Sequence, residues 1–205
     1  MKKSVFLSAA CLGTLLSALS LGAMAQGDAV AGQTKAALCA SCHGPDGNSP
    51  LAMNPKLAGQ NASYLVKQLQ DFKSGERPGP IMAPMAAGLS EQDMQDIAAF
   101  YAGQDITLEG ADPVGVDIAE TLYRAGNKEI SVAACSACHS PSGTGNAPAG
   151  FPAVGGQHAE YTLAQLRAFR SGERSNDDNG VMQDVVARLT DRELEVLANY
   201  LSGLH

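Results

Sequence analysis

Two cysteines and a histidine recur at one spacing in each half of the chain. The two Cys-x-x-Cys-His sets are Cys39, Cys42 and His43, and then Cys135, Cys138 and His139. This spacing is typical of covalent haem attachment, because two thiols on one helical turn can add to the two vinyl groups of a porphyrin. The histidine next to them brings a ring nitrogen to the iron. The sequence therefore predicts two covalently bound haem c groups, with His43 and His139 as proximal iron ligands.

A redox dithiol and a zinc site also use Cys-x-x-Cys pairs. A thioredoxin-like dithiol belongs near a βαβ pattern, and a four-cysteine zinc site needs its second pair within about 15–20 residues. The two pairs here lie far apart, and neither alternative explains the histidine after each pair. We therefore favour haem over a metal or dithiol site.

The sixth ligand of each iron is sought among the methionines. Those after the first motif are Met53, Met82, Met85 and Met94, whereas Met182 is the only one after the second motif. Met182 lies seven residues before Leu189, and the same count back from Leu89 gives Met82. We expect Met82 and Met182 as axial ligands, because a thioether opposite histidine stabilises ferrous iron and raises the reduction potential. Met85 and Met94 are expected to pack in the core.

Several other residues near the motifs could ligate the haem iron, hold its histidine or contact the haem. His158 competes for the second iron, but its equivalent in the first half is Asn61, so we do not expect it to be a ligand. Pro45 and Pro141, each two residues after a haem histidine, are expected to offer a carbonyl to its Nδ1–H. For the equivalent pair Tyr64 and Tyr161 two alternatives stay open: contact with haem or a propionate, or core packing with the hydroxyl at the surface.

The elements that position these residues are expected to be helices. Asp28 can cap a helix from Ala29 into Cys39, and residues 64–74 form an amphipathic pattern that ends at Gly75. A proline-rich loop over residues 78–85 follows. Ser90 and Asp93 then resemble a capping box at the start of a helix that ends at Gly103.

The second half of the chain repeats this pattern. Residues 64–77 match 161–174 at an offset of 97, and Ser90 with Asp93 is answered by Thr190 with Glu193. Such a repeat predicts an all-α fold made by tandem duplication of two small domains with a short linker. We place the boundary near Ala111, so that the domains span residues 26–111 and 112–205.

Residues 1–25 are typical of a cleaved signal peptide. Lys2 and Lys3 precede an apolar run over residues 5–21, and Ala23-Met24-Ala25 has the small-x-small pattern of a cleavage site. An uncleaved anchor is the alternative, but serine, threonine and glycine dilute the run. Without Lys2 and Lys3, 12 Lys and Arg stand against 21 Asp and Glu, a formal charge of −9 that argues against nucleic acid as a partner.

With these features assembled, the chain resembles the di-haem cytochrome c4 family. The residues that carry the resemblance are the two Cys-x-x-Cys-His motifs, the run 44–48, Pro55, Gly59-Gln60, Met82, the run 155–158 and Met182. The resemblance implies two class-I cytochrome c domains related by pseudo-twofold symmetry, with haem propionates near their interface and His/Met ligation of both irons. It also implies a periplasmic carrier, often loosely associated with the membrane, that passes electrons from the respiratory chain to a terminal oxidase or another reductase.

Two other function classes were compared with the carrier. A haem enzyme or enzyme subunit, such as a di-haem peroxidase or a dehydrogenase cytochrome subunit, needs an open or replaceable sixth ligand on one iron. The symmetric placement of Met82 and Met182 argues against this. A ligand-sensing haem module needs an attached output domain, and we expect none here. The sequence thus favours an electron carrier without enzymatic activity of its own.

Overall fold

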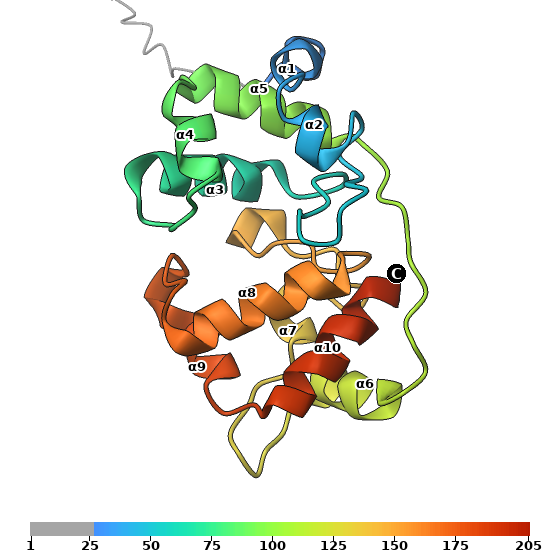
Figure 1. The fold of residues 1–205 in the computed structure, drawn as a ribbon. Helices are drawn as coiled ribbons and strands as arrows, with labels where there is room; N and C mark the ends of the chain where they lie inside the picture. Colours follow the sequence, from blue (N-terminus) through green and yellow to red (C-terminus); the bar gives the residue numbers. More distant parts are fainter. Residues whose placement is uncertain (1–26) are drawn as a thin grey trace, which may run out of the picture.

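The computed structural model describes residues 27–205, and all regular elements in this range are helices (Figure 1). The first half contains α1 (Ala29–Lys35), α2 (Ala40–His43), α3 (Ala62–Ser74), α4 (Met82–Ala87) and α5 (Glu91–Ala102). The second half contains α6 (Val116–Ala125), α7 (Ser136–His139), α8 (Ala159–Ser171), α9 (Val181–Val186) and α10 (Asp191–Gly203), with the 3₁₀ turns η1 (Ala147–Ala149) and η2 (Asp178–Gly180). The all-α prediction is confirmed. The predicted signal peptide lies outside the described residues.

Helix α5 forms the centre of the first half. Its side chains Ile97 and Tyr101 are at most 4% exposed, and they pack in one cluster with Ala36, the C-cap of α1, and Leu65 of α3. Helices α1 and α5 approach so closely at Gly32 that a Cβ there would lie 1.9 Å from the backbone oxygen of Asp96. A glycine is therefore required where these two helices cross.

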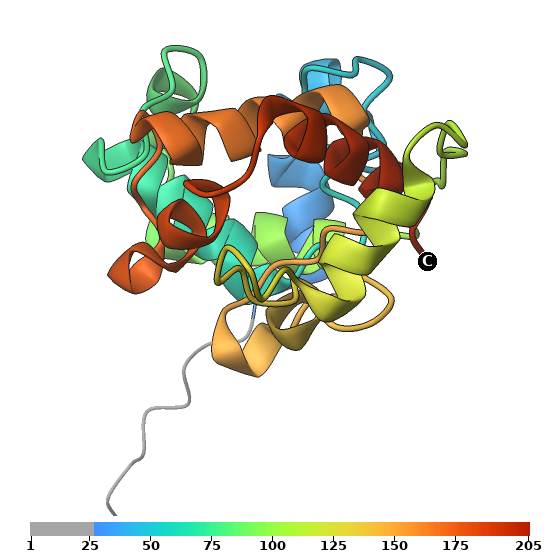
Figure 2. The same cartoon turned by 90° about the horizontal axis from the view of Figure 1, so that it is seen from below.

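Helix α10 forms the centre of the second half in the same way. It packs against α6 and α8, as Figure 2 shows from below, and it buries Leu194, Leu197 and Leu201 against Tyr123 of α6. Both central helices begin with a capping box, in which Ser90 pairs with Asp93 and Thr190 with Glu193. Both predicted helix starts are confirmed, and the duplication extends from sequence to packing.

Two predicted elements differ from the structure. The helix expected from Ala29 into Cys39 ends at Lys35, and Cys39 instead caps the separate short helix α2. The proline-rich loop ends earlier than expected, because α4 begins at Met82. Pro84 is compatible with that helix because it occupies the first turn, where its missing N–H group has no intrahelical acceptor to lose.

The two halves lie one above the other and are joined by residues 103–115, which run along one side of the molecule (Figure 1). Near its end this linker is held by α10, since Asn199 donates to the Asp112 carbonyl at 2.7 Å and accepts from the Asp112 N–H at 2.9 Å. The boundary expected near Ala111 falls within this segment and stays a prediction. Of the helices described, none is long and apolar enough to span a bilayer.

Candidate haem sites and the interface between the halves

The first Cys-x-x-Cys-His motif lies on α2 and ends at a buried histidine. His43 is only 7% exposed, and Nδ1 of its ring lies 2.9 Å from the carbonyl oxygen of Pro55. Burial lowers the pKa of His43, against a smaller raising effect of the Pro55 carbonyl. The ring is therefore neutral, and because the carbonyl can only accept, Nδ1 carries the proton. The lone pair on Nε2 is then available to bind a metal ion.

The second motif has the same geometry on α7. His139 is 8% exposed, its Nδ1 lies 2.9 Å from the carbonyl oxygen of Pro152, and burial lowers its pKa. The expectation that Pro45 and Pro141 hold the rings is wrong. The residue after each histidine has a positive φ and leaves the helix, whereas the loop beyond it returns Pro55 or Pro152 to the ring. The sequence indication for these two prolines was that they are equivalent in the repeat, at an offset of 97.

The four cysteines of the motifs form no disulfide with one another, and the setting of two of them does not suit a redox dithiol. Burial raises the pKa of Cys39, and it raises the pKa of Cys135 to about 11. Reactive dithiols need a lowered pKa, because the thiolate is the nucleophile. Nor does the described part of the chain hold a group of three or more His, Cys, Asp and Glu side chains arranged for a metal ion. The raised pKa values of Cys39 and Cys135 thus argue against a redox dithiol.

The two expected methionine ligands lie on equivalent short helices. Met82 is the first residue of α4, Met182 is the second residue of α9, and both are partly buried. In the second half Asp177 fixes this turn, accepting from the backbone N–H of Met182 at 2.7 Å. The position equivalent to Met85 is Val185. Met94 is fully buried in the core of the first half, as expected.

Two arginines cross the interface between the halves in a reciprocal arrangement. Arg77 donates to the hydroxyl of Tyr161, and Arg174 donates to the hydroxyl of Tyr64, each at 2.9 Å. Each guanidinium also lies over a phenylalanine ring of its own half. The tyrosine hydroxyls are therefore bound at the interface, and the alternative that placed them at the surface is wrong.

These guanidinium groups are buried without a carboxylate in direct contact. Arg77 is 7% and Arg174 is 6% exposed, and neither forms an ion pair with a carboxylate in residues 27–205. Their other partners are neutral amides, such as Gln68 and Gln165. Burying a cation is costly unless an anion accompanies it. Two buried cations of this kind would suit the carboxylates of haem propionates.

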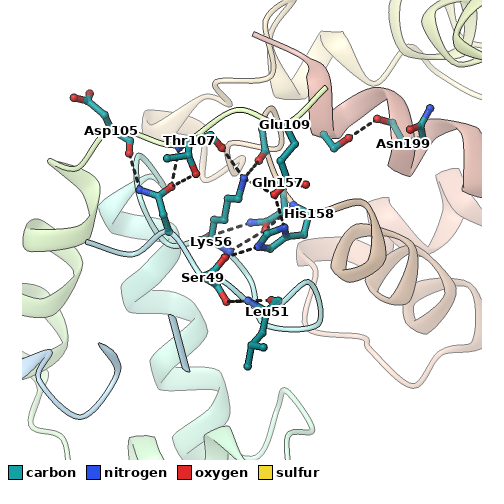
Figure 3. Close-up of polar contacts among 12 residues, drawn as sticks. Ser49, Leu51, Lys56, Asp105, Thr107, Glu109, Gln157, His158 and Asn199 are labelled. Carbon is teal, nitrogen blue, oxygen red and sulfur yellow. Dashed lines mark hydrogen bonds and ion pairs between the residues drawn. The ribbon is translucent and has the colours of Figure 1, made fainter. Parts of the chain in front are cut away.

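The linker side of the interface holds a second polar cluster, which has no counterpart in the repeat (Figure 3). Glu109 accepts from Lys56 Nζ at 3.0 Å and lies 2.9 Å from Nδ1 of His158. The other ring nitrogen of His158 lies 2.9 Å from the carbonyl oxygen of Ser49. Burial raises the pKa of Glu109, but the hydrogen bond and charge of Lys56, together with His158, outweigh it and lower the pKa overall.

The role of His158 at this interface was not foreseen from the sequence. Its ring is buried between the halves and both of its nitrogens have protein partners, in agreement with the expectation that it is not an iron ligand. The sequence signal for this cluster is a break in the repeat. When the halves are aligned, Lys56 is equivalent to Ala153 and His158 to Asn61, so neither residue type is repeated.

The fold and the paired motifs define a c-type cytochrome with two domains. The family model described as cytochrome c matches residues 29–102 and again 124–205. The cytochrome c4 of Azotobacter vinelandii is 46% identical, over 95% of this chain and 98% of its own length. The crystal structure of reduced recombinant cytochrome c4 from Pseudomonas stutzeri is similar with a TM-score of 0.84 at 48% identity, covering 87% of this chain and 100% of that one.

The chain belongs to the cytochrome c4 family. It is a di-haem electron-transfer cytochrome with two covalently bound haem c groups. A more distant relative is named thiosulfate dehydrogenase electron acceptor, from Stutzerimonas stutzeri; it is 39% identical, over 81% of this chain and 78% of its own length.

Proposed function

We propose that this protein is a periplasmic carrier that takes electrons from a respiratory-chain donor and passes them to a terminal oxidase or another reductase. Cys39, Cys42, Cys135 and Cys138 attach the haems, His43 and Met82 ligate the first iron, and His139 and Met182 ligate the second. The observation that carries the proposal is the equivalence of the two halves. Each presents a buried neutral imidazole with Nδ1 fixed and a methionine at the start of a short helix.

The chain's own residues serve electron transfer by keeping each site rigid and dry. Haem iron supplies a reversible one-electron change between ferric and ferrous states. The proline carbonyls hold the imidazole rings in one orientation. The apolar cores around α5 and α10 exclude water, which limits rearrangement when the charge changes. The buried Arg77 and Arg174 place positive charge at the interface between the halves, where they would hold haem propionates.

Catalysis by the haem irons themselves is the competing function. A peroxidase needs a sixth position that substrate can enter, and the matched α4 and α9 offer a thioether in both halves. The relative named as an electron acceptor supports a carrier as well, with a dehydrogenase as the donor. We therefore propose that this chain has no enzymatic activity of its own.

The ferric absorption spectrum of the purified holoprotein tests the proposal. Two His/Met haems give low-spin spectra with methionine-to-iron charge-transfer absorption, and peroxide or cyanide added at low concentration should leave them unchanged. A high-spin fraction approaching one haem of the two, or rapid reaction with peroxide, would contradict the carrier and favour the enzyme.

Location and membrane association are tested on cell fractions. Intact mass of the periplasmic protein should correspond to a chain that begins at Gln26 and carries two haems. Its formal charge of −9 favours peripheral contact through a basic membrane protein over contact with anionic lipid. A salt wash should therefore release any membrane-bound fraction, whereas a fraction that only detergent releases would indicate an uncleaved anchor.

A further inference from the structure

Two glutamines at equivalent positions cross the interface reciprocally. Gln157 of the second half accepts from the N–H of Lys56 at 2.9 Å and donates to the Lys56 carbonyl at 2.9 Å. Gln60 of the first half accepts from the N–H of Ala153 at 2.8 Å and donates to the Ala153 carbonyl at 2.9 Å. Both glutamines are 8% exposed. Each therefore holds one backbone residue of the other half in a buried site.

The orientation of each amide is fixed by its partners. The Oε1 atom of Gln60 also accepts from the N–H of Asn61, and the Oε1 atom of Gln157 accepts from the N–H of His158. Each amide oxygen thus faces two N–H donors, while each Nε2 faces a carbonyl. A flipped amide would set donors against donors, so only one orientation satisfies every group.

The backbone residues that the glutamines hold lie directly after the prolines that bind the haem histidines. The carbonyl of Pro55 and the N–H of Lys56 are the two ends of one peptide group, as are the carbonyl of Pro152 and the N–H of Ala153. A continuous chain of hydrogen bonds results: His43 Nδ1–H to the Pro55 carbonyl, and Lys56 N–H to Gln157. The same chain runs from His139 through the second peptide group to Gln60.

We propose that each glutamine tunes the haem of the opposite half: Gln157 acts on the iron held by His43, and Gln60 on the iron held by His139. They are positioning residues that act through the peptide group and the imidazole. The inference rests on the proposed function, because it takes His43 and His139 as the proximal ligands.

The sign of the effect follows from cooperative polarisation. A peptide whose N–H is hydrogen-bonded carries more negative charge on its carbonyl oxygen, which makes that oxygen a stronger acceptor. The stronger acceptor draws the Nδ1 proton and makes the imidazole a better donor to iron, which favours the ferric state. Loss of the glutamine should therefore shift its haem toward the ferrous state.

The test uses the di-haem holoprotein with Gln157→Leu and Gln60→Leu, studied by redox titration with NMR signals assigned to each haem. Gln157→Leu should shift the reduction equilibrium of the first haem about threefold toward the ferrous form, about 28 mV at 59 mV per tenfold change. It should leave the second haem nearly unchanged, and Gln60→Leu should show the opposite pattern. The Nδ1 proton of the affected histidine should move upfield in the reduced protein, which reports the weaker hydrogen bond directly.

The matched control is Asn61→Ala. It removes a 2.8 Å hydrogen bond across the interface to the Phe151 carbonyl, which belongs to neither of the two hydrogen-bond chains. It should move neither potential. If a leucine variant fails to fold, Gln157→Glu keeps an acceptor for Lys56 and should shift the first haem toward the ferric form.

Two outcomes would overturn the inference. Variants that act on the haem of their own half, or on both haems equally, would show only a loosened interface. A wild-type spectrum without histidine-ligated haem would overturn the proposed ligands as well. If the wild-type spectra show histidine-ligated haem but neither variant acts selectively on the haem of the opposite half, only the inference about the glutamines is overturned.

Discussion

At the scale of single residues, each histidine proposed to ligate haem is held by a proline that follows it by a full loop. The carbonyls of Pro55 and Pro152 each lie 2.9 Å from a ring nitrogen, and a proline fixes the φ angle of the residue that offers the acceptor. The imidazole ring therefore has one tautomer and one orientation. The proposed methionine ligands are then the part of each site that mutation can vary without disturbing the imidazole.

The methionines give the first prediction. If Met82 and Met182 are the axial ligands, Met82→Ala and Met182→Ala should each lose about half of the charge-transfer absorption of the ferric protein, because each would remove one of two iron–sulfur bonds. The haem of the mutated half should also fall in potential and bind cyanide. Met85→Ala is the matched control, since its equivalent is Val185, and it should keep the full band. If Met85→Ala lost the band while Met82→Ala kept it, the alignment of the halves would be wrong at this loop.

The attachment residues are predicted from local spacing, and that prediction stands as a proposal, whereas the partners that hold the histidines could not be predicted. Cys39, Cys42 and His43 are fixed by one helical turn, so the motif alone specifies them. The Pro55 carbonyl and the buried Arg77 and Arg174 depend on where the chain returns after a loop or across the interface. A sequence contains the repeat of such residues, but it does not show which atoms meet.

At the scale of elements, α5 and α10 position the rest of their halves. Capping boxes at their starts and apolar side chains at helical spacing are strong sequence signals, and both helices were predicted. The break between α1 and α2 and the early start of α4 were missed. Short helices gain little from their own hydrogen bonds, so tertiary packing sets their ends.

The crossing of α1 and α5 gives the second prediction. Gly32→Ala should destabilise the protein by about 2–3 kcal/mol, because the new Cβ would lie 1.9 Å from the Asp96 oxygen and must push the helices apart. Gly88→Ala is the matched control: its φ is −85° and nothing lies within 4 Å of the added Cβ. Denaturant unfolding followed by circular dichroism should show the control within about 0.5 kcal/mol of wild type. Equal effects would mean that the close approach is not what selects glycine.

The same helix pair gives a prediction about acid. The hydrogen bond from Lys35, followed by those from the Asp28 N–H and the Gln92 side chain, lowers the pKa of Asp96 from 3.8 to about 2. A lowered folded-state pKa means that this contribution to stability is complete above pH 3.8 and is lost as the pH falls through about 2. Acid unfolding of wild type should therefore steepen between about pH 4 and 2.

The matched variant is Asp96→Asn, which has no carboxylate to protonate. Its stability at pH 7 should be lower than that of wild type, while its decline between pH 4 and 2 should be shallower. Thermal unfolding across this pH range measures both. Parallel curves for the two proteins would show that Asp96 does not set the acid dependence.

At the scale of the whole molecule, the halves share a polar interface rather than a common core. The two apolar clusters have no residue in common, and the contacts between the halves include hydrogen bonds of paired glutamines, arginines and tyrosines. Buried polar groups require matched partners, so the two halves fit in one relative orientation. The duplication predicted that there are two halves, but only the folded chain shows how they meet.

Net charge gives the prediction at this scale. With a formal charge of −9 after removal of residues 1–25, electron delivery to a terminal oxidase should slow as salt rises, because screening shortens the range of attraction to a basic docking site. Turnover with respiratory membranes across a salt series measures this. Oxidation by a neutral quinone is the control and should stay constant. An unchanged rate with the oxidase would mean that the acidity serves solubility alone.

The cluster of Lys56, Glu109 and His158 bears on how the two halves came to differ. In a symmetric pair of identical subunits, any substitution at an interface appears on both sides of the twofold axis. Here Lys56 is equivalent to Ala153 and His158 to Asn61 in the aligned halves, and Glu109 comes from a linker that exists only once. Covalent fusion thus freed the duplicated interface from obligatory symmetry. Mutations could then accumulate on one copy at a time, so that one polypeptide can hold two unequal redox centres in a fixed order.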